Sequence, residues 1–139
     1  MWKYDFSEFT SASPERLWSP LVDVQNWPQI DRQIESIEIE GSPGEGKVFF
    51  LTPRSGPRLK LQIETLVPPK QYTDLCFLPL ARMRTTHSLS RVQNQTEIRV
   101  SIEIKGPLTF LWKRIVGMKH ASGLKQQTRR LIECAQSVV

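Results

Sequence analysis

The order of hydrophobic patterns along this chain restricts its fold most strongly. An alternating strand pattern opens the sequence at Trp2, Tyr4 and Phe6, and a capped helix pattern follows at 13–18. A long series of short strand patterns continues to Lys105, and a helical pattern then reaches the last residue. The connections between strands are too short for crossovers, so neighbouring strands are expected to be antiparallel. This order predicts an α+β fold in which a curved antiparallel sheet wraps around one long helix, with room for a hydrophobic molecule between them.

Helix signals lie on both sides of the strand region. Ser13 is a favourable N-cap, and Pro14 suits the first turn because its missing N–H needs no partner there. Pro20 and Pro28 interrupt the pattern, so this helix is expected to be short, with Leu17, Trp18 and Leu21 as its buried stripe. Residues 27–30 are expected to form a second short helical piece or turn. A Gly-Pro pair at 106–107 ends the strands. The closing helix carries one apolar stripe, formed by Leu108, Leu111, Trp112, Ile115, Ala121, Leu124, Thr128, Leu131, Ala135 and Val138.

Between these helices the hydrophobic period changes to two, which is the period of half-buried strands. The clearest case is the alternation of Leu59, Leu61 and Ile63 with polar neighbours. The glycine-rich segment 41–46 is expected to be a β-turn, because Val48 stands where a phosphate loop needs serine or threonine. About seven strands are predicted in all, at 2–9, 34–40, 47–51, 58–64, 72–77, 82–89 and 97–105.

Size and composition predict a single domain over residues 1–139. A chain of 139 residues that is 39% hydrophobic is large enough for one core. The opening segment alternates in polarity, unlike a signal peptide, and no apolar run approaches the roughly 18 residues needed to span a membrane. We therefore expect a soluble, cytoplasmic protein.

The net charge of +5 lies entirely in the last segment. Residues 108–139 carry six lysines and arginines against Glu133 alone, whereas the rest of the chain carries thirteen residues of each sign. The solvated face of an amphipathic helix explains this excess, and an acidic membrane surface is the alternative partner. Nucleic acid is not expected, because the segment lacks interleaved aromatics and clustered arginines. The oligomeric state stays open.

Neither a metal nor a cofactor is expected. Cys76 and Cys134 lack metal-ligand spacing and are too few for a disulfide framework, so we expect two small buried or half-buried thiols. His87 and His120 have no evident third partner for a metal ion. The positions expected to face the cavity contain no Ser-His-Asp spacing and no close carboxylate pair.

Four segments carry a resemblance to a known superfamily: 12–18 after the first strand, 23–28, 41–46, and 104–108 with Leu111 and Trp112. Together they resemble the START-like, helix-grip superfamily (SRPBCC), and most of all its polyketide cyclase/dehydrase-type branch. The resemblance implies one strand, two short helices, six further strands and a long C-terminal helix, with a hydrophobic cavity between helix and sheet. Members of the superfamily bind lipids, quinones, polyketides or plant hormones, and only some are enzymes.

Nine residues are predicted to contact a ligand in this cavity: Phe50, Leu61, Tyr72, Met83, Thr85, His87, Ile102, Trp112 and Met118. The facing of Tyr72 is ambiguous, because Thr73, Leu75 and Phe77 form the more apolar alternation. Trp112 and Met118 suit the cavity mouth, although such residues on an amphipathic helix usually belong to the core. Asp74 is expected to face water.

His87 is the one candidate catalytic residue. An inward imidazole with a pKa near neutrality can orient a ligand carbonyl or transfer a proton. A hydrogen-bonded core histidine, or one turned outward by a bulge, is the alternative. His120 lies close to the apolar stripe of the last helix, near the same space.

Three functions fit these patterns. The first is binding of a small hydrophobic molecule, such as a lipid, polyketide or quinone-like compound, oriented by Thr85 and His87. The second is a cyclase or dehydratase-type enzyme in which His87, with Tyr72, moves protons; it needs a second acid or base near His87, and the sequence identifies none. The third is a lipid carrier that docks on anionic membranes through the basic helix, which salt-sensitive binding to anionic vesicles would distinguish.

Overall fold

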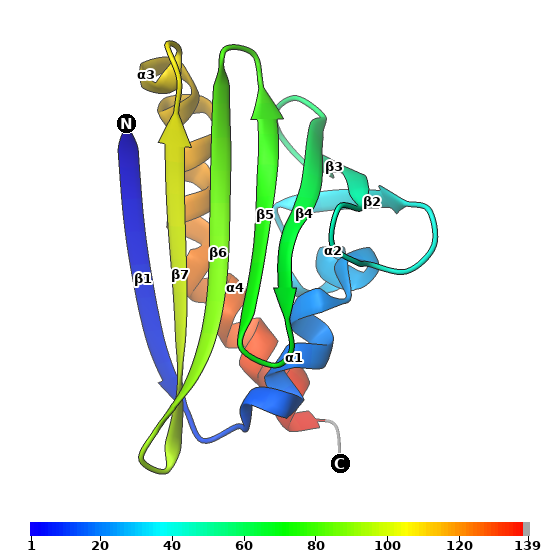
Figure 1. The fold of residues 1–139 in the computed structure, drawn as a ribbon, viewed down its shortest axis with the longest axis vertical. Coiled ribbons are helices and arrows are strands. Elements are labelled where there is room, and N and C mark those ends of the chain that lie inside the picture. The colour runs from blue at the N-terminus through cyan, green and yellow to red at the C-terminus, as the bar shows by residue number, and fades with distance from the viewer. Residues whose placement is uncertain (138–139) are drawn as a thin grey trace.

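Seven strands form one sheet with a long helix against one face in the computed structural model, which describes residues 1–137 (Figure 1). The strands are β1 Trp2–Thr10, β2 Ile34–Ile39, β3 Val48–Pro53, β4 Leu59–Val67, β5 Gln71–Leu78, β6 Ala81–Val92 and β7 Gln95–Lys105. The helices are α1 Pro14–Val22, α2 Trp27–Ile30, α3 Thr109–Trp112 and α4 Met118–Ser137, with a 3₁₀ turn at Val24–Asn26 and a π-helical turn at Lys113–Gly117.

The strand order across the sheet is β1-β7-β6-β5-β4-β3-β2, and every neighbouring pair is antiparallel. Strands β2 to β7 follow one another as hairpins, and β1 closes the far edge by pairing with β7. This arrangement confirms the predicted curved antiparallel sheet and the order of its elements. The long helix crosses behind the sheet in Figure 1, and the end of α4 lies beside α1.

Helix α1 follows the sequence signals at its start and in its length. The Ser13 hydroxyl accepts a hydrogen bond from the Arg16 backbone N–H at 3.2 Å, which is the predicted cap. The helix is short, as predicted, and ends at Val22 with Pro20 inside it. Leu17 and Leu21 are both buried, and their packing outweighs the hydrogen bond that proline removes.

A continuous helical segment runs from α3 through the π-helical turn into α4. Gly117 at the end of this turn allows the helix to lie close to the sheet, because a Cβ there would sit 2.8 Å from Ile104 Cδ1 and from the Trp2 ring. The stripe of α4 buries Ala121, Leu124, Thr128, Leu131 and Ala135 as predicted, while Val138 lies outside the described residues.

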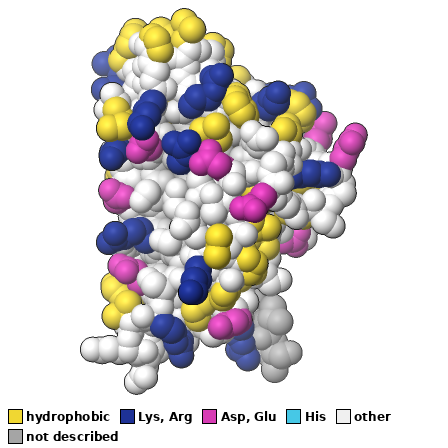
Figure 2. Space-filling view, viewed as in Figure 1, with side chains coloured by type: hydrophobic (Ala, Val, Ile, Leu, Met, Phe, Trp, Pro, Cys, Tyr) yellow, Lys and Arg dark blue, Asp and Glu magenta, His cyan; other side chains and the backbone are white. Residues whose placement is uncertain are grey.

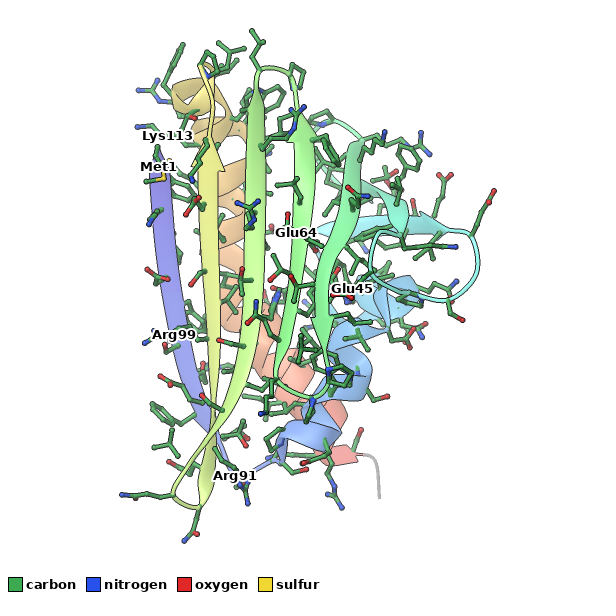
Figure 3. The ribbon with its side chains drawn as sticks, viewed as in Figure 1. Met1, Glu45, Glu64, Arg91, Arg99 and Lys113 are labelled. Carbon is green, nitrogen blue, oxygen red and sulfur yellow. The ribbon has the colours of Figure 1, made fainter. Side chains whose placement is uncertain are left out.

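The two faces of the sheet differ in polarity. Strand β7 buries Ile98, Val100, Ile102 and Ile104 on its inner face. The outer face carries interspersed charges (Figure 2), among them the pair of Arg84 with Glu64, the residue labelled on β4 in Figure 3. One apolar and one charged face are typical of an antiparallel sheet with a single covered side.

Candidate functional site

A pocket of about 460 Å³ lies between the inner face of the sheet and the first turns of α4. Its walls are largely apolar and come from four elements: Leu51 on β3, Leu59 and Leu61 on β4, Met83 on β6, and Ile115 and Val116 on the π-helical turn. Four polar side chains form its floor, namely the buried Asp74, Thr85 and His87 from β5 and β6, and His120 from α4. This volume is within the range of pockets that hold small organic molecules.

Asp74 on the floor is coupled to Tyr72 behind it. The Tyr72 hydroxyl donates a hydrogen bond to Asp74 Oδ2 at 3.0 Å, and both side chains are buried. Burial raises the pKa of Asp74 to about 7, and the charge of Glu64 adds to this rise, whereas the Tyr72 hydrogen bond opposes it. Burial next to the carboxyl also raises the pKa of Tyr72 well above its ordinary value. A carboxyl with this pKa exchanges its proton close to neutral pH.

His87 lies opposite Tyr72 in the pairing of β5 with β6, with the two ring centroids 5.9 Å apart. Burial lowers the pKa of His87 to about 3, and the neighbouring His120 contributes to the fall. The imidazole is therefore neutral at physiological pH. Its buried Nδ1 atom has no hydrogen-bond partner among the described residues, which is rare in folded proteins.

Trp27 supports this end of the pocket. Its indole N–H donates to the Leu21 carbonyl at 3.0 Å, and its ring meets Phe49 and Tyr72 edge-on, with centroids 5.7 and 5.8 Å away. The cluster restricts the rotamer of Tyr72 and thereby the orientation of Asp74.

His120 faces the pocket from α4. It lies beside the apolar stripe of this helix, as the sequence predicted. Its Nε2 lies 3.4 Å from the Thr85 hydroxyl. Burial lowers the pKa of His120 to about 4, so this imidazole is also neutral near pH 7. Asp74 and Thr85 are directly paired across β5 and β6, which brings the four floor groups together.

Four of the nine predicted contact residues line the pocket: Leu61, Met83, Thr85 and His87. Tyr72 lies behind the floor, and Ile102 packs in the core between β7 and the helix. Trp112 donates its indole N–H to the Pro79 carbonyl at 2.8 Å, and Met118 is 56% exposed. These last four residues do not line the pocket. Their role in ligand binding stays a prediction.

Phe50 does not have the predicted facing. Phe49 is fully buried instead, and the Phe50 ring lies on the outer face, with the Arg58 guanidinium carbon 4.2 Å from its centroid. Two adjacent phenylalanines give no clear alternation, so the pattern did not decide which of them points inward. Pairing with Leu61 places Phe49 on the inner face, and Leu51 follows it there into the pocket wall.

The expectation that Asp74 faces water is also wrong, and its inward position is the main functional feature that sequence reasoning missed. Asp74 is only 4% exposed. Asp74 pairs with Ile63 on β4 and with Thr85 on β6, and these inner-face partners place 72, 74 and 76 on the inner face. The sequence did contain a signal for the facing of Asp74. Only Pro79 and Leu80 separate β5 from β6, so an inward His87 implies that its cross-strand partner Tyr72, and with it Asp74, also faces inward.

The cysteines differ from one another. Cys76 is fully buried, and burial raises the pKa of its thiol to about 12, which makes it unreactive. Cys134 is exposed, so the expectation of a buried or half-buried thiol is wrong there. Within residues 1–137, no three side chains of the metal-binding types lie together. No helix in that range combines the length and hydrophobicity needed to cross a membrane.

Comparisons with known proteins bear on the fold. No family model matches the chain, and no curated protein sequence is significantly similar to it. Solved structures do match. The di-domain ARO/CYC StfQ from the steffimycin biosynthetic pathway is similar with a TM-score of 0.80 and 9% identity, over 96% of this chain and 50% of that one. Ara h 8.0201 is similar with a TM-score of 0.71 and 19% identity, over 94% of this chain and 97% of that one. Protein MLL2253 from Mesorhizobium loti is similar with a TM-score of 0.74 and 18% identity, over 99% of this chain and 98% of that one.

These similarities and the observed topology define a helix-grip protein. The chain therefore has the fold that its resemblance to the START-like superfamily implied. At such low identities the likeness concerns the fold alone, so the function has to be argued from the pocket.

Proposed function

We propose that this protein binds a small apolar molecule in the pocket between α4 and the sheet, with a hydroxyl or carbonyl group of the molecule placed against the polar floor. The observation that carries the proposal is the buried, unpartnered Nδ1 of His87 beside a pocket with apolar walls. A buried polar atom without a partner costs free energy, and a bound molecule can supply the missing hydrogen bond. The similar structures include the di-domain ARO/CYC StfQ from a biosynthetic pathway, which supports a ligand-holding role for this fold.

The floor offers both donors and acceptors, and it carries no net charge below pH 7. Neutral imidazoles at His87 and His120 each have one donor and one acceptor nitrogen, and the Thr85 hydroxyl has both capacities. Below pH 7 the protonated Asp74 carboxyl adds a donor. Affinity comes mainly from the apolar body, because burial contributes about 25 cal/mol per Å² before ordering costs.

Filling the pocket tests the proposal directly. Leu51→Trp places a large side chain in the pocket wall, and Phe50→Trp makes the matched change on the outer face of the same strand. We expect Leu51→Trp to weaken binding of the neutral fluorophore N-phenyl-1-naphthylamine by about tenfold or more, a loss near 1.4 kcal/mol. Phe50→Trp should leave the affinity unchanged. Fluorescence titration measures both, and circular dichroism checks the fold. Equal affinity in the two variants would show that the probe binds elsewhere.

Asp74 favours a second function, catalysis by proton transfer on the bound molecule. A carboxyl with a pKa of about 7 shares the pocket with two neutral imidazoles, and such separated pKa values are typical of acid–base pairs. This arrangement fits the cyclase or dehydratase alternative better than His87 alone.

The catalytic alternative predicts a separation of binding from turnover. Asp74→Asn is expected to retain the neutral fluorophore with an affinity within about twofold, because the amide has nearly the shape of the carboxyl. The same change should abolish loss of water from a bound β-hydroxyacyl or poly-β-keto thioester, followed by mass spectrometry. Water loss at the wild-type rate in Asp74→Asn, or none in the wild type, would leave binding alone as the function.

A further inference from the structure

Three cationic side chains gather at the mouth of the pocket. Arg32 follows α2, Arg54 follows β3, and Lys119 lies in the first turn of α4. All three line the pocket and are exposed, whereas the floor residues Asp74, Thr85 and His87 are buried. The pocket thus passes from a cationic opening to a buried interior that contains no cation.

Contacts across the opening hold these cations near one another. The Arg54 backbone N–H donates to the Gln33 carbonyl at 2.8 Å, which joins the segment after α2 to the loop after β3. The Lys119 ammonium reaches from α4 to the Ser55 hydroxyl at 3.4 Å, so it spans the gap between helix and loop. Three segments far apart in the sequence therefore converge on one opening.

Among the described residues, the mouth cations have no anionic partner of their own. Some cations elsewhere in the protein are paired with a carboxylate, as in Arg84 with Glu64 or Arg58 with Glu38. Within residues 1–137, no carboxylate oxygen lies within 4.0 Å of the charged nitrogens of Arg32, Arg54 or Lys119. The one carboxylate at the mouth, Asp31, accepts the Gln33 N–H at 2.9 Å instead. The opening consequently carries an excess of positive charge.

We infer that the molecule held in this pocket is an apolar monoanion, such as a long-chain or aromatic carboxylate, whose anionic group lies at the mouth among Arg54, Lys119 and Arg32. The inference deepens the proposed function and depends on it. The apolar body fits the walls formed by the leucines of β3 and β4, and an uncharged oxygen at its far end reaches the floor. Burial raises the pKa of Asp74 and lowers those of both histidines, so the floor provides no cation for the anionic group. The anionic group of the bound molecule is therefore stabilised only at the opening.

A matched pair of probes separates charge recognition from apolar binding. N-phenyl-1-naphthylamine is neutral, and 8-anilinonaphthalene-1-sulfonate adds one anionic group to the same aromatic body. Arg54→Gln and Lys119→Gln each remove one mouth cation. Lys125→Gln is the control, because Lys125 is exposed on the same helix but does not line the pocket.

Each mouth variant is expected to weaken binding of the sulfonate probe by about three- to tenfold, which is the effect typical of partly exposed charge pairs. The affinity for the neutral probe should change by less than about twofold. Lys125→Gln should change neither. Raising the salt concentration should weaken binding of the sulfonate probe to the wild type and leave binding of the neutral probe unaffected.

The outcomes distinguish the two proposals. Equal weakening of both probes, no weakening of either, or a loss in Lys125→Gln as large as in the mouth variants would overturn the monoanion inference while the neutral probe still supports apolar binding. If the wild type binds neither probe, the proposed function itself fails.

Discussion

Replacing Gly106 with alanine is expected to destabilise the fold by about 3 kcal/mol or more, the largest loss anticipated for any single methyl group added to this protein. Gly106 has a φ of +128°, a conformation that residues with a side chain rarely adopt. A Cβ there would lie 2.5 Å from the Leu80 carbonyl oxygen and 2.7 Å from Ala81 Cα. Both are backbone atoms, so no side-chain rotation relieves the overlap.

The cost is large because Gly106 joins the sheet to the long helix. The Leu80 carbonyl accepts the Leu108 N–H at 3.1 Å, and the Gly106 carbonyl accepts the Thr109 hydroxyl at 2.7 Å. A shift that makes room for the methyl group breaks this junction and displaces the start of the helix that covers the pocket.

Urea denaturation measures the effect, with Gly44→Ala as the control. A Cβ at Gly44 meets nothing within 4 Å, and its φ is not in the left-handed region, so alanine there should change the free energy of unfolding by less than about 0.5 kcal/mol. A Gly106→Ala protein within about 1 kcal/mol of wild type would show that the junction is more adaptable than this geometry allows.

Asp74→Asn is expected to stabilise the protein at pH 8, by an amount on the order of 4 kcal/mol, and to leave its stability almost unchanged at pH 4. The pKa of Asp74 rises from 3.8 in the unfolded chain to about 7 in the folded protein, chiefly through burial. Between these values the folded state binds more protons than the unfolded state. The free energy of unfolding therefore falls as pH rises from 4 to 7, and above pH 7 the full cost of a buried carboxylate is present.

The two histidines change the pH dependence of the free energy of unfolding in the opposite direction to Asp74, but they do not obscure the effect of Asp74→Asn. Their folded-state pKa values, about 3 for His87 and about 4 for His120, lie below the ordinary 6.5. The unfolded state consequently binds more protons below pH 6.5, and stability falls as pH decreases from there. Both histidines are present in the wild type and in Asp74→Asn, so this contribution cancels in the difference between the two proteins.

The measurement is the free energy of unfolding of each protein from pH 4 to pH 8. Asparagine still accepts the Tyr72 hydroxyl hydrogen bond, so the comparison isolates the charge. Glu35→Gln, at an exposed position on β2, controls for the loss of one acidic residue. A difference between Asp74→Asn and wild type that stays constant with pH would mean that Asp74 is solvated in the folded protein.

The amino-acid sequence determined the elements and their order. Alternation at Leu59, Leu61 and Ile63 defined a strand, Ser13 and Pro14 defined a helix start, and the stripe through Leu124 and Leu131 defined the helix against the sheet. These signals are local, because hydrophobic period and capping depend on residues only a few positions apart. They also placed Met83, Thr85 and His87 correctly on one inner face.

The tertiary structure alone decided which chemistry meets in the pocket. The pairing of Asp74 with the inner-face residues Ile63 and Thr85 turned it inward, and a one-residue change of register would have turned it to water. Arg32, Arg54 and Lys119 converge on the mouth only after the chain has folded. Strand facing and long-range convergence depend on partners distant in sequence, and no local pattern contains that information.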